Sequence, residues 1–248
     1  MADAKEYYNR TSKDYVEKWK KIDSDSENLT NQFRLKLIRS VIEMADIRPH
    51  DKVVEIGCGT GLVLKELLKY TKPVYGVDVS LEMLKRAQDS VLRDQKVIIV
   101  EDFKRAKETE KETDAILLEN DILDLEIPED YFDKILSLEV FRYLKETKKA
   151  LTNIAKIMKP ESVFVFTATN QFSANLFPIK FLIRKWLGLV DVQKEIFQYF
   201  TTERSIRKNI REAGLEVVEF RKLDKRLKNF PVLRNFSDTF IIAVKRAN

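Results

Sequence analysis

The stretch from Val53 to Gly61 constrains the fold of this chain more than any other segment. It reads VVEIGCGTG, so an apolar run reaches the acid Glu55 and three glycines follow at alternate positions. Amphipathic helical sequence begins directly afterwards, at Leu62. Glycine is needed where the backbone takes a positive φ or where a ligand lies against the main chain. The stretch therefore predicts a strand, a tight turn and a helix start, which together can hold a nucleotide-like ligand.

The spacing of the glycines distinguishes two kinds of nucleotide site. Dinucleotide-binding turns have the pattern G-x-G-x-x-G and hold a pyrophosphate at the helix end. This turn has G-x-G-x-G, and Glu55 precedes its first glycine, Gly57. A fixed carboxylate repels a pyrophosphate but accepts hydrogen bonds from an ammonium group. We therefore expect a cationic ligand without phosphates, and S-adenosylmethionine, with its amino group, sulfonium and adenosine, has that chemistry.

A second predicted strand, residues 73–78, ends at the acid Asp78. Asp78 follows Gly57 by about twenty residues, the separation expected for a carboxylate that binds a ribose diol. Ser80 then suits the N-cap of a helix over residues 81–87. These features extend the nucleotide interpretation to the ribose.

Three further strands are predicted downstream. Residues 115–119 form the first of them, and Asp121 and Ile122 follow it, an acid for an adenine amino group and an apolar side chain for the ring. Residues 132–140 contain the next strand and residues 163–167 the last. Helical periodicity between the last two predicts a connecting helix, as expected for a parallel sheet.

These segments together resemble the class I S-adenosylmethionine-dependent methyltransferases, in particular the small-molecule branch that includes ubiquinone and menaquinone biosynthesis enzymes. The likeness extends over residues 35–167, and more loosely from residue 201 onward. It implies a Rossmann-like α/β fold with a doubly wound sheet of seven strands, mostly parallel with the last strand antiparallel, and helices on both faces. It also implies a cofactor site formed by Glu55, Gly57, Cys58, Gly59, Gly61, Asp78, Val79, Met83, Asp121, Ile122, Ser137 and Leu138.

One departure from that family pattern bears on catalysis. Quinone-type members often carry S-L-E-V-L-E-H after the fourth strand, whereas this chain has SLEVFRY, with Arg142 and Tyr143 in place of the acid and the histidine. We therefore expect neither a histidine base nor a metal-assisted mechanism based on that pattern. Glu139 and Tyr143 are the candidate bases, needed only when the acceptor must lose a proton.

The composition of the chain restricts the kinds of protein to which it can belong. A chain of 248 residues that is 44% hydrophobic suits one α/β domain with additions. Its single cysteine, Cys58, is interpreted as a packing residue, and without a cysteine–histidine cluster we expect no metal site. The single histidine, His50, falls in a turn before the first strand, away from the ligand. Because no signal core or membrane-spanning window is found, we expect a cytoplasmic protein without a transmembrane segment.

Two segments outside the core pattern are candidate covers for the site. Residues 1–30 predict a helix with Tyr8 and Tyr15 on one face, either a lid or a helix docked on the core, ahead of a main domain over residues 31–248. Residues 170–200 predict an inserted basic amphipathic helix that covers a lipophilic substrate, contacts a membrane surface, or packs on the domain or a second subunit. Four aromatic residues are the candidate substrate-lid residues: Tyr8, Tyr15, Phe141 and Trp186.

Residues 96–114 fit the pattern least well. The stretch from 97 to 100 has strand character and a charged run follows it, so we expect an inserted hairpin or helix and take residues 115–119 as the core strand. The last helix begins near Thr202 and ends at Gly214, followed by two antiparallel strands separated by a basic segment.

The functional prediction is methyl transfer by in-line displacement from S-adenosylmethionine to a small, lipophilic molecule. One alternative is an RNA methyltransferase that uses the basic segment at residues 221–234, and another is a non-catalytic cofactor-binding partner subunit. The net charge of +5 is modest and its basic residues alternate with acids, which disfavours nucleic acid. The identity of the acceptor and the choice between monomer and homodimer stay open.

Overall fold

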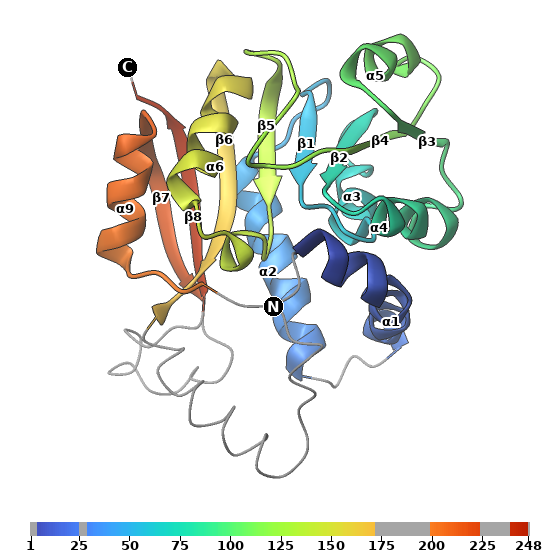
Figure 1. Ribbon diagram of the computed structural model, residues 1–248, viewed down its shortest axis with the longest axis horizontal. Coiled ribbons are helices and arrows are strands. Elements are labelled where there is room, and N and C mark those ends of the chain that lie inside the picture. Colours follow the sequence, from blue (N-terminus) through green and yellow to red (C-terminus); the bar gives the residue numbers. More distant parts are fainter. Residues whose placement is uncertain (1–3, 25–28, 172–198, 224–238, 248) are drawn as a thin grey trace.

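The computed structural model describes residues 4–24, 29–171, 199–223 and 239–247, which form an eight-stranded sheet with helices on both faces (Figure 1). The strands are β1 Val53–Ile56, β2 Val74–Asp78, β3 Val97–Val100, β4 Ala115–Glu119, β5 Phe132–Ser137, β6 Met158–Thr169, β7 Leu215–Leu223 and β8 Thr239–Arg246. The helices are α1 Ala4–Ser24, α2 Leu29–Ala45, α3 Leu62–Leu67, α4 Leu81–Arg86 with its π-helical continuation η1 Ala87–Val91, α5 Phe103–Thr109, the 3₁₀ turn η2 Phe141–Tyr143, α6 Thr147–Ile157 and α9 Glu203–Glu212.

The strand order across the sheet is β3-β4-β2-β1-β5-β6-β8-β7. Neighbouring strands from β3 to β6 are parallel, and β8 is antiparallel to both β6 and β7. The predicted doubly wound, mostly parallel sheet with an antiparallel last strand is therefore confirmed. The chain reverses direction across the sheet at β1, and in such sheets ligands bind beyond the carboxyl ends of the strands at that position.

The prediction of seven strands is wrong, because β3 adds an eighth at the edge of the sheet. β4 pairs with β2 over five residues, so the choice of residues 115–119 as a core strand is right. Residues 97–100 pair with β4 on its other side, and α5 connects the two strands. The 96–114 segment is thus a strand and a helix that widen the sheet, and the side chain of Asp102 accepts a hydrogen bond from Arg105 N to cap that helix.

Side chains alternate between two apolar layers along the central strands. Val54 and Ile56 of β1 face one layer and Val53 the other, as the two-residue period of a strand requires. Apolar side chains of α5, α6 and α9 fill the first layer, and those of α2, α3 and α4 fill the second. Because both faces are covered, the central strands are apolar on both sides, as their sequence predicted.

Helix α2 packs on the sheet through one apolar face. Its side chains at Leu37, Ile38, Val41 and Ile42 are buried against the sheet. Helix α1 lies at the edge where the parallel strands end and packs on α4 (Figure 1). The side chain of Tyr15 falls outside the described residues, and so does most of the predicted cover at residues 170–200, including Trp186. Among the described helices, none has the length and apolar character of a membrane span.

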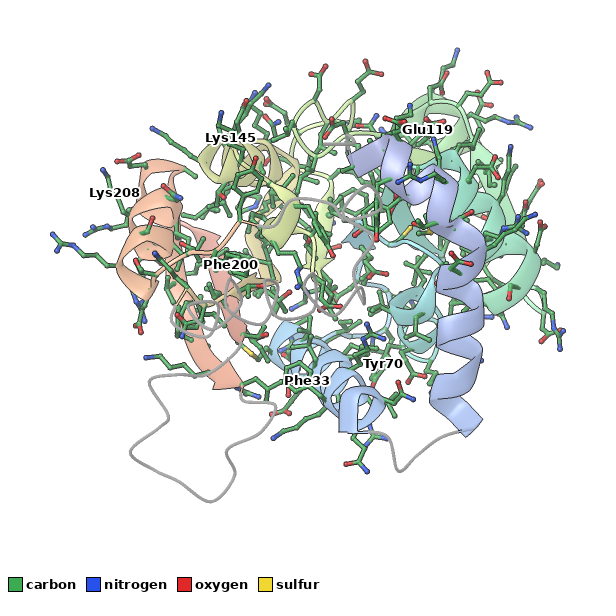
Figure 2. The ribbon with its side chains drawn as sticks, turned by 60° about the horizontal axis from the view of Figure 1, so that its bottom comes forward. Phe33, Tyr70, Glu119, Lys145, Phe200 and Lys208 are labelled. Carbon is green, nitrogen blue, oxygen red and sulfur yellow. The ribbon has the colours of Figure 1, made fainter. Side chains whose placement is uncertain are left out.

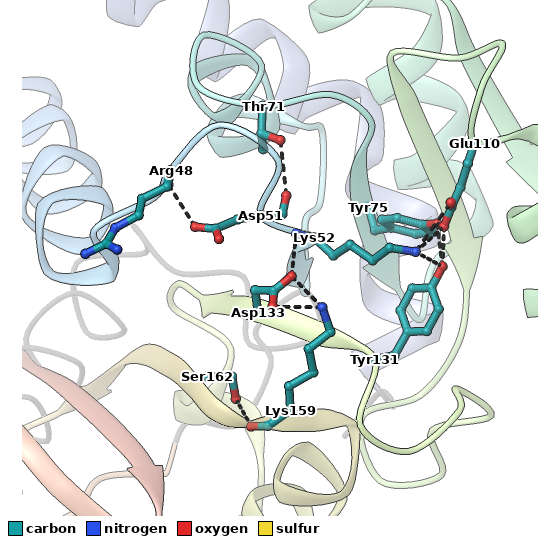
Figure 3. A network of polar contacts seen from close by, with 10 residues as sticks. All are labelled: Arg48, Asp51, Lys52, Thr71, Tyr75, Glu110, Tyr131, Asp133, Lys159 and Ser162. Atoms are coloured by element: carbon teal, nitrogen blue, oxygen red, sulfur yellow. Dashed lines mark hydrogen bonds and ion pairs between the residues drawn. The ribbon is translucent and has the colours of Figure 1, made fainter.

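The parallel strands begin at one side of the sheet, here called the amino edge, and end at the other, the carboxyl edge, where α1 lies (Figure 1). The amino edge carries a network of ion pairs and hydrogen bonds (Figure 3). Lys52 Nζ, just before β1, lies 3.0 Å from Glu110 Oε1 and 2.7 Å from the Tyr131 hydroxyl. Tyr75 and Tyr131 both donate to the same Glu110 oxygen. Nearby, Lys159 Nζ donates to Asp133 Oδ2 at 2.7 Å. Glu110 comes just after α5, so this network fixes the added strand and helix to the core.

Candidate active site

The glycine turn between β1 and α3 has the backbone geometry that its sequence predicted. Gly57, Gly59 and Gly61 have φ angles of 76°, 52° and 80°, which residues with side chains rarely adopt. A Cβ at Gly57 would lie 2.1 Å from Cγ2 of Val140, so a side chain has no room there. A Cβ at Gly59 would meet no atom within 4 Å, so the main chain is open to a ligand at that point.

Asp78, at the end of β2, joins this turn to the next loop. Its Oδ2 accepts a hydrogen bond from Gly59 N at 2.8 Å, and its Oδ1 accepts one from Ser80 N at 2.9 Å. The side chain is buried, and burial raises the pKa of Asp78 to about 6 although the backbone N–H donors act to lower it. A carboxylate holds about four lone-pair sites, so Asp78 keeps acceptor capacity for hydroxyl groups of a ligand.

Glu55 is more deeply buried, at 2% exposure. Its Oε2 has no hydrogen-bond partner among the described residues. Burial, together with the nearby charge of Asp78, raises the pKa of Glu55 well above its ordinary value. Buried polar atoms in proteins are nearly always paired, so an unpaired carboxylate oxygen here indicates a missing cationic or hydrogen-bonding partner.

These groups lie in the wall of a cavity of about 710 Å³. That volume falls within the range of about 300–1,000 Å³ typical of small-molecule sites. The cavity lies over the carboxyl ends of β1, β2, β4 and β5, and side chains from α1 and α2 contribute to it. The predicted residues that line it are Glu55, Gly57, Cys58, Gly59, Asp78, Val79, Met83, Asp121, Ile122, Leu138, Glu139, Tyr143 and Tyr8.

Among the predicted residues whose side chains or backbone turns the structure describes in full, three do not line this cavity. Gly61 is the N-cap of α3, behind the turn. Ser137 is fully buried and donates its hydroxyl to Ile56 O at 2.9 Å, which ties β5 to β1. Phe141 packs in the core with its ring centroid 4.6 Å from that of Phe166, because η2 directs the side chain toward the sheet. The placement of Phe141 corrects its prediction as a substrate-lid residue.

The two candidate catalytic residues share one side of the cavity. Glu139 has a φ of 58°, which is uncommon for a residue with a side chain. Its N–H donates to Thr167 Oγ1 at 2.7 Å, and its carboxylate accepts from Arg142 Nη1 at 3.0 Å. The ring of Tyr143 meets that of Tyr8 edge-on, with centroids 5.7 Å apart. An acid and two tyrosines therefore face the same space.

Several residues that line the cavity were not predicted. Lys5 on α1 forms an ion pair of 2.6 Å with Glu119 at the end of β4. Figure 2 labels Glu119, together with Lys145 of the cavity wall. Asn120 N donates to Asp78 O at 3.0 Å, which connects the second and fourth strand ends. Tyr199 and Lys145 also contribute to the wall. Lys5 lies three residues before Tyr8 on a helix, so the two side chains share a face. Because Tyr8 was a predicted site residue, this spacing was the sequence signal that could have identified Lys5.

A family model described as a methyltransferase domain matches residues 29–220. An uncharacterized protein of Methanocaldococcus jannaschii, MJ1252, is 27% identical over 183 residues, 74% of this chain and 56% of that protein. An uncharacterized methyltransferase of Anoxybacillus flavithermus is 25% identical over 60% of this chain and 62% of its own length. The chain thus spans less than two thirds of these curated relatives.

Among solved structures, the magnesium protoporphyrin IX methyltransferase of Synechocystis, with bound SAH, superimposes with a TM-score of 0.64 at 19% identity. The superposition covers 98% of this chain and 97% of that one. It shows that the two chains share a fold.

Proposed function

The chain belongs to the methyltransferase domain family, and on that basis we propose that it is an S-adenosylmethionine-dependent methyltransferase that acts on a small molecule. The observation that carries the proposal is the unpaired Glu55 oxygen, buried beside Asp78 in the cavity wall. Two neighbouring buried acids favour a ligand with positive charge and hydroxyl groups. S-adenosylmethionine has both, and when bound it supplies a methyl group activated by a sulfonium.

The proposed roles follow from the positions of the side chains. Glu55 accepts hydrogen bonds from the amino group of the cofactor, and the Asp78 carboxylate accepts them from the ribose hydroxyls. Asp121 faces the adenine amino group. The apolar side chains of Ile122 and Met83 enclose the ring. The open main chain at Gly59 lets the cofactor lie against the turn.

On the acceptor side, the protein holds the nucleophile in line with the methyl group and excludes water. Glu139 takes the proton of an acceptor that must lose one, while the hydrogen bond from Arg142 orients its carboxylate. Tyr8 and Tyr143 form an aromatic surface against which a flat or apolar acceptor packs. Residues 1–30 act as a lid on the domain formed by residues 31–248.

A cavity of about 710 Å³ supports a small substrate over RNA. Within the described part of the basic C-terminal segment, Arg221 is paired with Glu219 and Glu43, and Lys222 with Glu203. These cations are neutralised by the protein, so they do not favour a phosphate backbone as partner. The names of some relatives, such as the ubiquinone biosynthesis O-methyltransferase of Maricaulis maris, also point to a small acceptor.

Titration calorimetry with S-adenosylmethionine and its demethylated product tests the proposal, with NAD as the control. We expect binding of both sulfur compounds and none of NAD. A screen of small acceptors for release of the demethylated product then tests turnover. The absence of heat with either sulfur compound would remove the basis of the proposal.

A further inference from the structure

Helix α1 contacts three separate loops of the site through one face. Lys5, Tyr8 and Asn9 are spaced so that they lie together on that face. Lys5 pairs with Glu119 at the end of β4, and Tyr8 contacts Tyr143 after β5. Asn9 Oδ1 accepts a hydrogen bond of 2.6 Å from the Ser80 hydroxyl, in the loop after β2.

Ser80 is the most constrained of these contact points. It is fully buried, and its N–H donates to Asp78 Oδ1 at 2.9 Å. Its hydroxyl accepts from Met83 N at 3.2 Å, which caps α4, and donates to Asn9. One buried residue thus connects the proposed ribose carboxylate, the start of α4 and helix α1.

We propose that Asn9 is a positioning residue of the cofactor site. Through Ser80 it holds the loop that carries Asp78, so that docking of α1 and binding of the cofactor strengthen each other. This inference rests on the proposed function, in which Asp78 binds the ribose. Because the coupling between two binding events is reciprocal, the cofactor must stabilise docked α1 by the same factor by which docked α1 improves cofactor affinity.

The Asn9–Ser80 contact is more buried than the Lys5–Glu119 contact, so we expect Asn9 to contribute more than Lys5 to the docking of α1. The Lys5–Glu119 pair is solvated, with side chains 49% and 31% exposed, and such pairs contribute little. Without the Asn9 side chain the Ser80 hydroxyl loses its acceptor while α1 still covers it, and a buried unsatisfied donor is unfavourable. The loop is then free to rearrange, which changes the orientation of Asp78.

The test compares Asn9→Ala with Lys13→Ala, a matched change at an exposed position of the same helix. Calorimetry gives the Kd for S-adenosylmethionine, and amide hydrogen exchange gives the protection of residues 4–14 with and without it. We expect Asn9→Ala to raise the Kd about tenfold and to reduce the cofactor-dependent protection of α1 by a similar factor. Lys13→Ala should change neither quantity.

Asn9→Asp, which keeps an oxygen acceptor opposite Ser80, should bind the cofactor more tightly than Asn9→Ala. Three results would overturn the inference: an unchanged Kd in Asn9→Ala, a raised Kd with unchanged protection of α1, or equal losses in the two Asn9 variants. Failure of the unmodified chain to bind S-adenosylmethionine is distinguishable from these, because it would overturn the proposed function as well.

Discussion

At the amino edge of the sheet Lys52 Nζ lies 3.0 Å from Glu110 Oε1, whereas at the carboxyl edge Glu55 Oε2 is buried without a partner. Burial acts to raise the pKa of Glu110, but hydrogen bonds from Tyr131, Tyr75 and Lys52 bring it below its ordinary value. At the other edge, burial raises the pKa of both Glu55 and Asp78. The charged form of a carboxyl group is therefore stabilised at the amino edge, whereas at the carboxyl edge the charged form is disfavoured.

The difference separates a structural network from a binding site. An acid whose partners all come from the protein is satisfied, and its contribution is to stability. An acid buried without a cation is unfavourable in the free protein, and a ligand that carries a positive charge can compensate for this. This contrast predicts that substitutions at the two edges affect different measurements.

The largest effect is expected from Asp78→Ala at the carboxyl edge. Loss of the carboxylate removes hydrogen bonds to the ligand hydroxyls, each worth about 1.5–3 kcal/mol when one partner is charged, so affinity for S-adenosylmethionine should fall about a hundredfold. Calorimetry measures the change. Asp133→Ala at the amino edge is the control and should leave the affinity unchanged. Equal affinities in the Asp78 variant and the unmodified chain would contradict the assignment.

A reciprocal pair of changes tests the contrast directly. Glu55→Gln removes an ionisable group whose charged form burial disfavours, so we expect cofactor affinity to fall about tenfold while the free protein becomes more stable. Glu110→Gln weakens the pairing with Lys52 and should lower the free energy of unfolding by about 1–3 kcal/mol, with no change in affinity. Urea unfolding and calorimetry on both variants give the four values. A destabilised Glu55→Gln would show that its carboxylate is satisfied within the protein.

The pKa of Asp78 makes stability depend on pH. The folded value of about 6 lies above the unfolded value of about 3.9, so the folded state binds the proton more tightly. Stability contributed by this group is therefore present at low pH and lost as the pH rises through 6. Between pH 5 and pH 7 it should decrease by about 1 kcal/mol. In Asp78→Asn, urea unfolding should no longer show this decrease between pH 5 and pH 7. An identical pH dependence of the free energy of unfolding in both proteins would contradict the raised pKa of Asp78.

The smallest effect is expected from Tyr131→Phe at the amino edge. This change removes one hydrogen-bond donor from Glu110 but keeps the ring packed against Phe103 and Phe132. The free energy of unfolding should fall by about 1 kcal/mol, a typical value for one hydrogen bond. Thermal unfolding measures it, and cofactor affinity serves as the control that should not move. A weakened affinity would mean that the two edges are not independent.

The features of the site that local sequence encodes were predictable. A positive φ at Gly57 and Gly59 follows from residue type, and Asp78 follows from its place after a short apolar strand. Residues 97–100 were recognised as strand-like but not as part of the main sheet, because the charged run after them hides a short helix whose apolar positions, Phe103 and Ala106, are only three residues apart. The direction of Phe141 depends on a single 3₁₀ turn, which periodicity does not reveal.

The contacts between α1 and the loops of the site could not be predicted from the sequence. Asn9 and Ser80 are 71 residues apart, and Lys5 is more distant still from Glu119. Nothing in the pattern of residues 1–30 identifies Ser80 as a partner. The contact exists because the parallel strands end at one edge of the sheet, where α1 also lies (Figure 1).

The sequence by itself determined the backbone of the glycine turn, the layers of the sheet and the chemistry of the acids that follow its strands, because these depend on residue type and short-range spacing. The tertiary structure alone decided which acids are paired. Lys52 reaches Glu110 across 58 residues of sequence, while Glu55 is enclosed with an oxygen unpaired. Pairing and burial are properties of groups brought together by the fold, and they distinguish a stabilising carboxylate from one that binds a ligand.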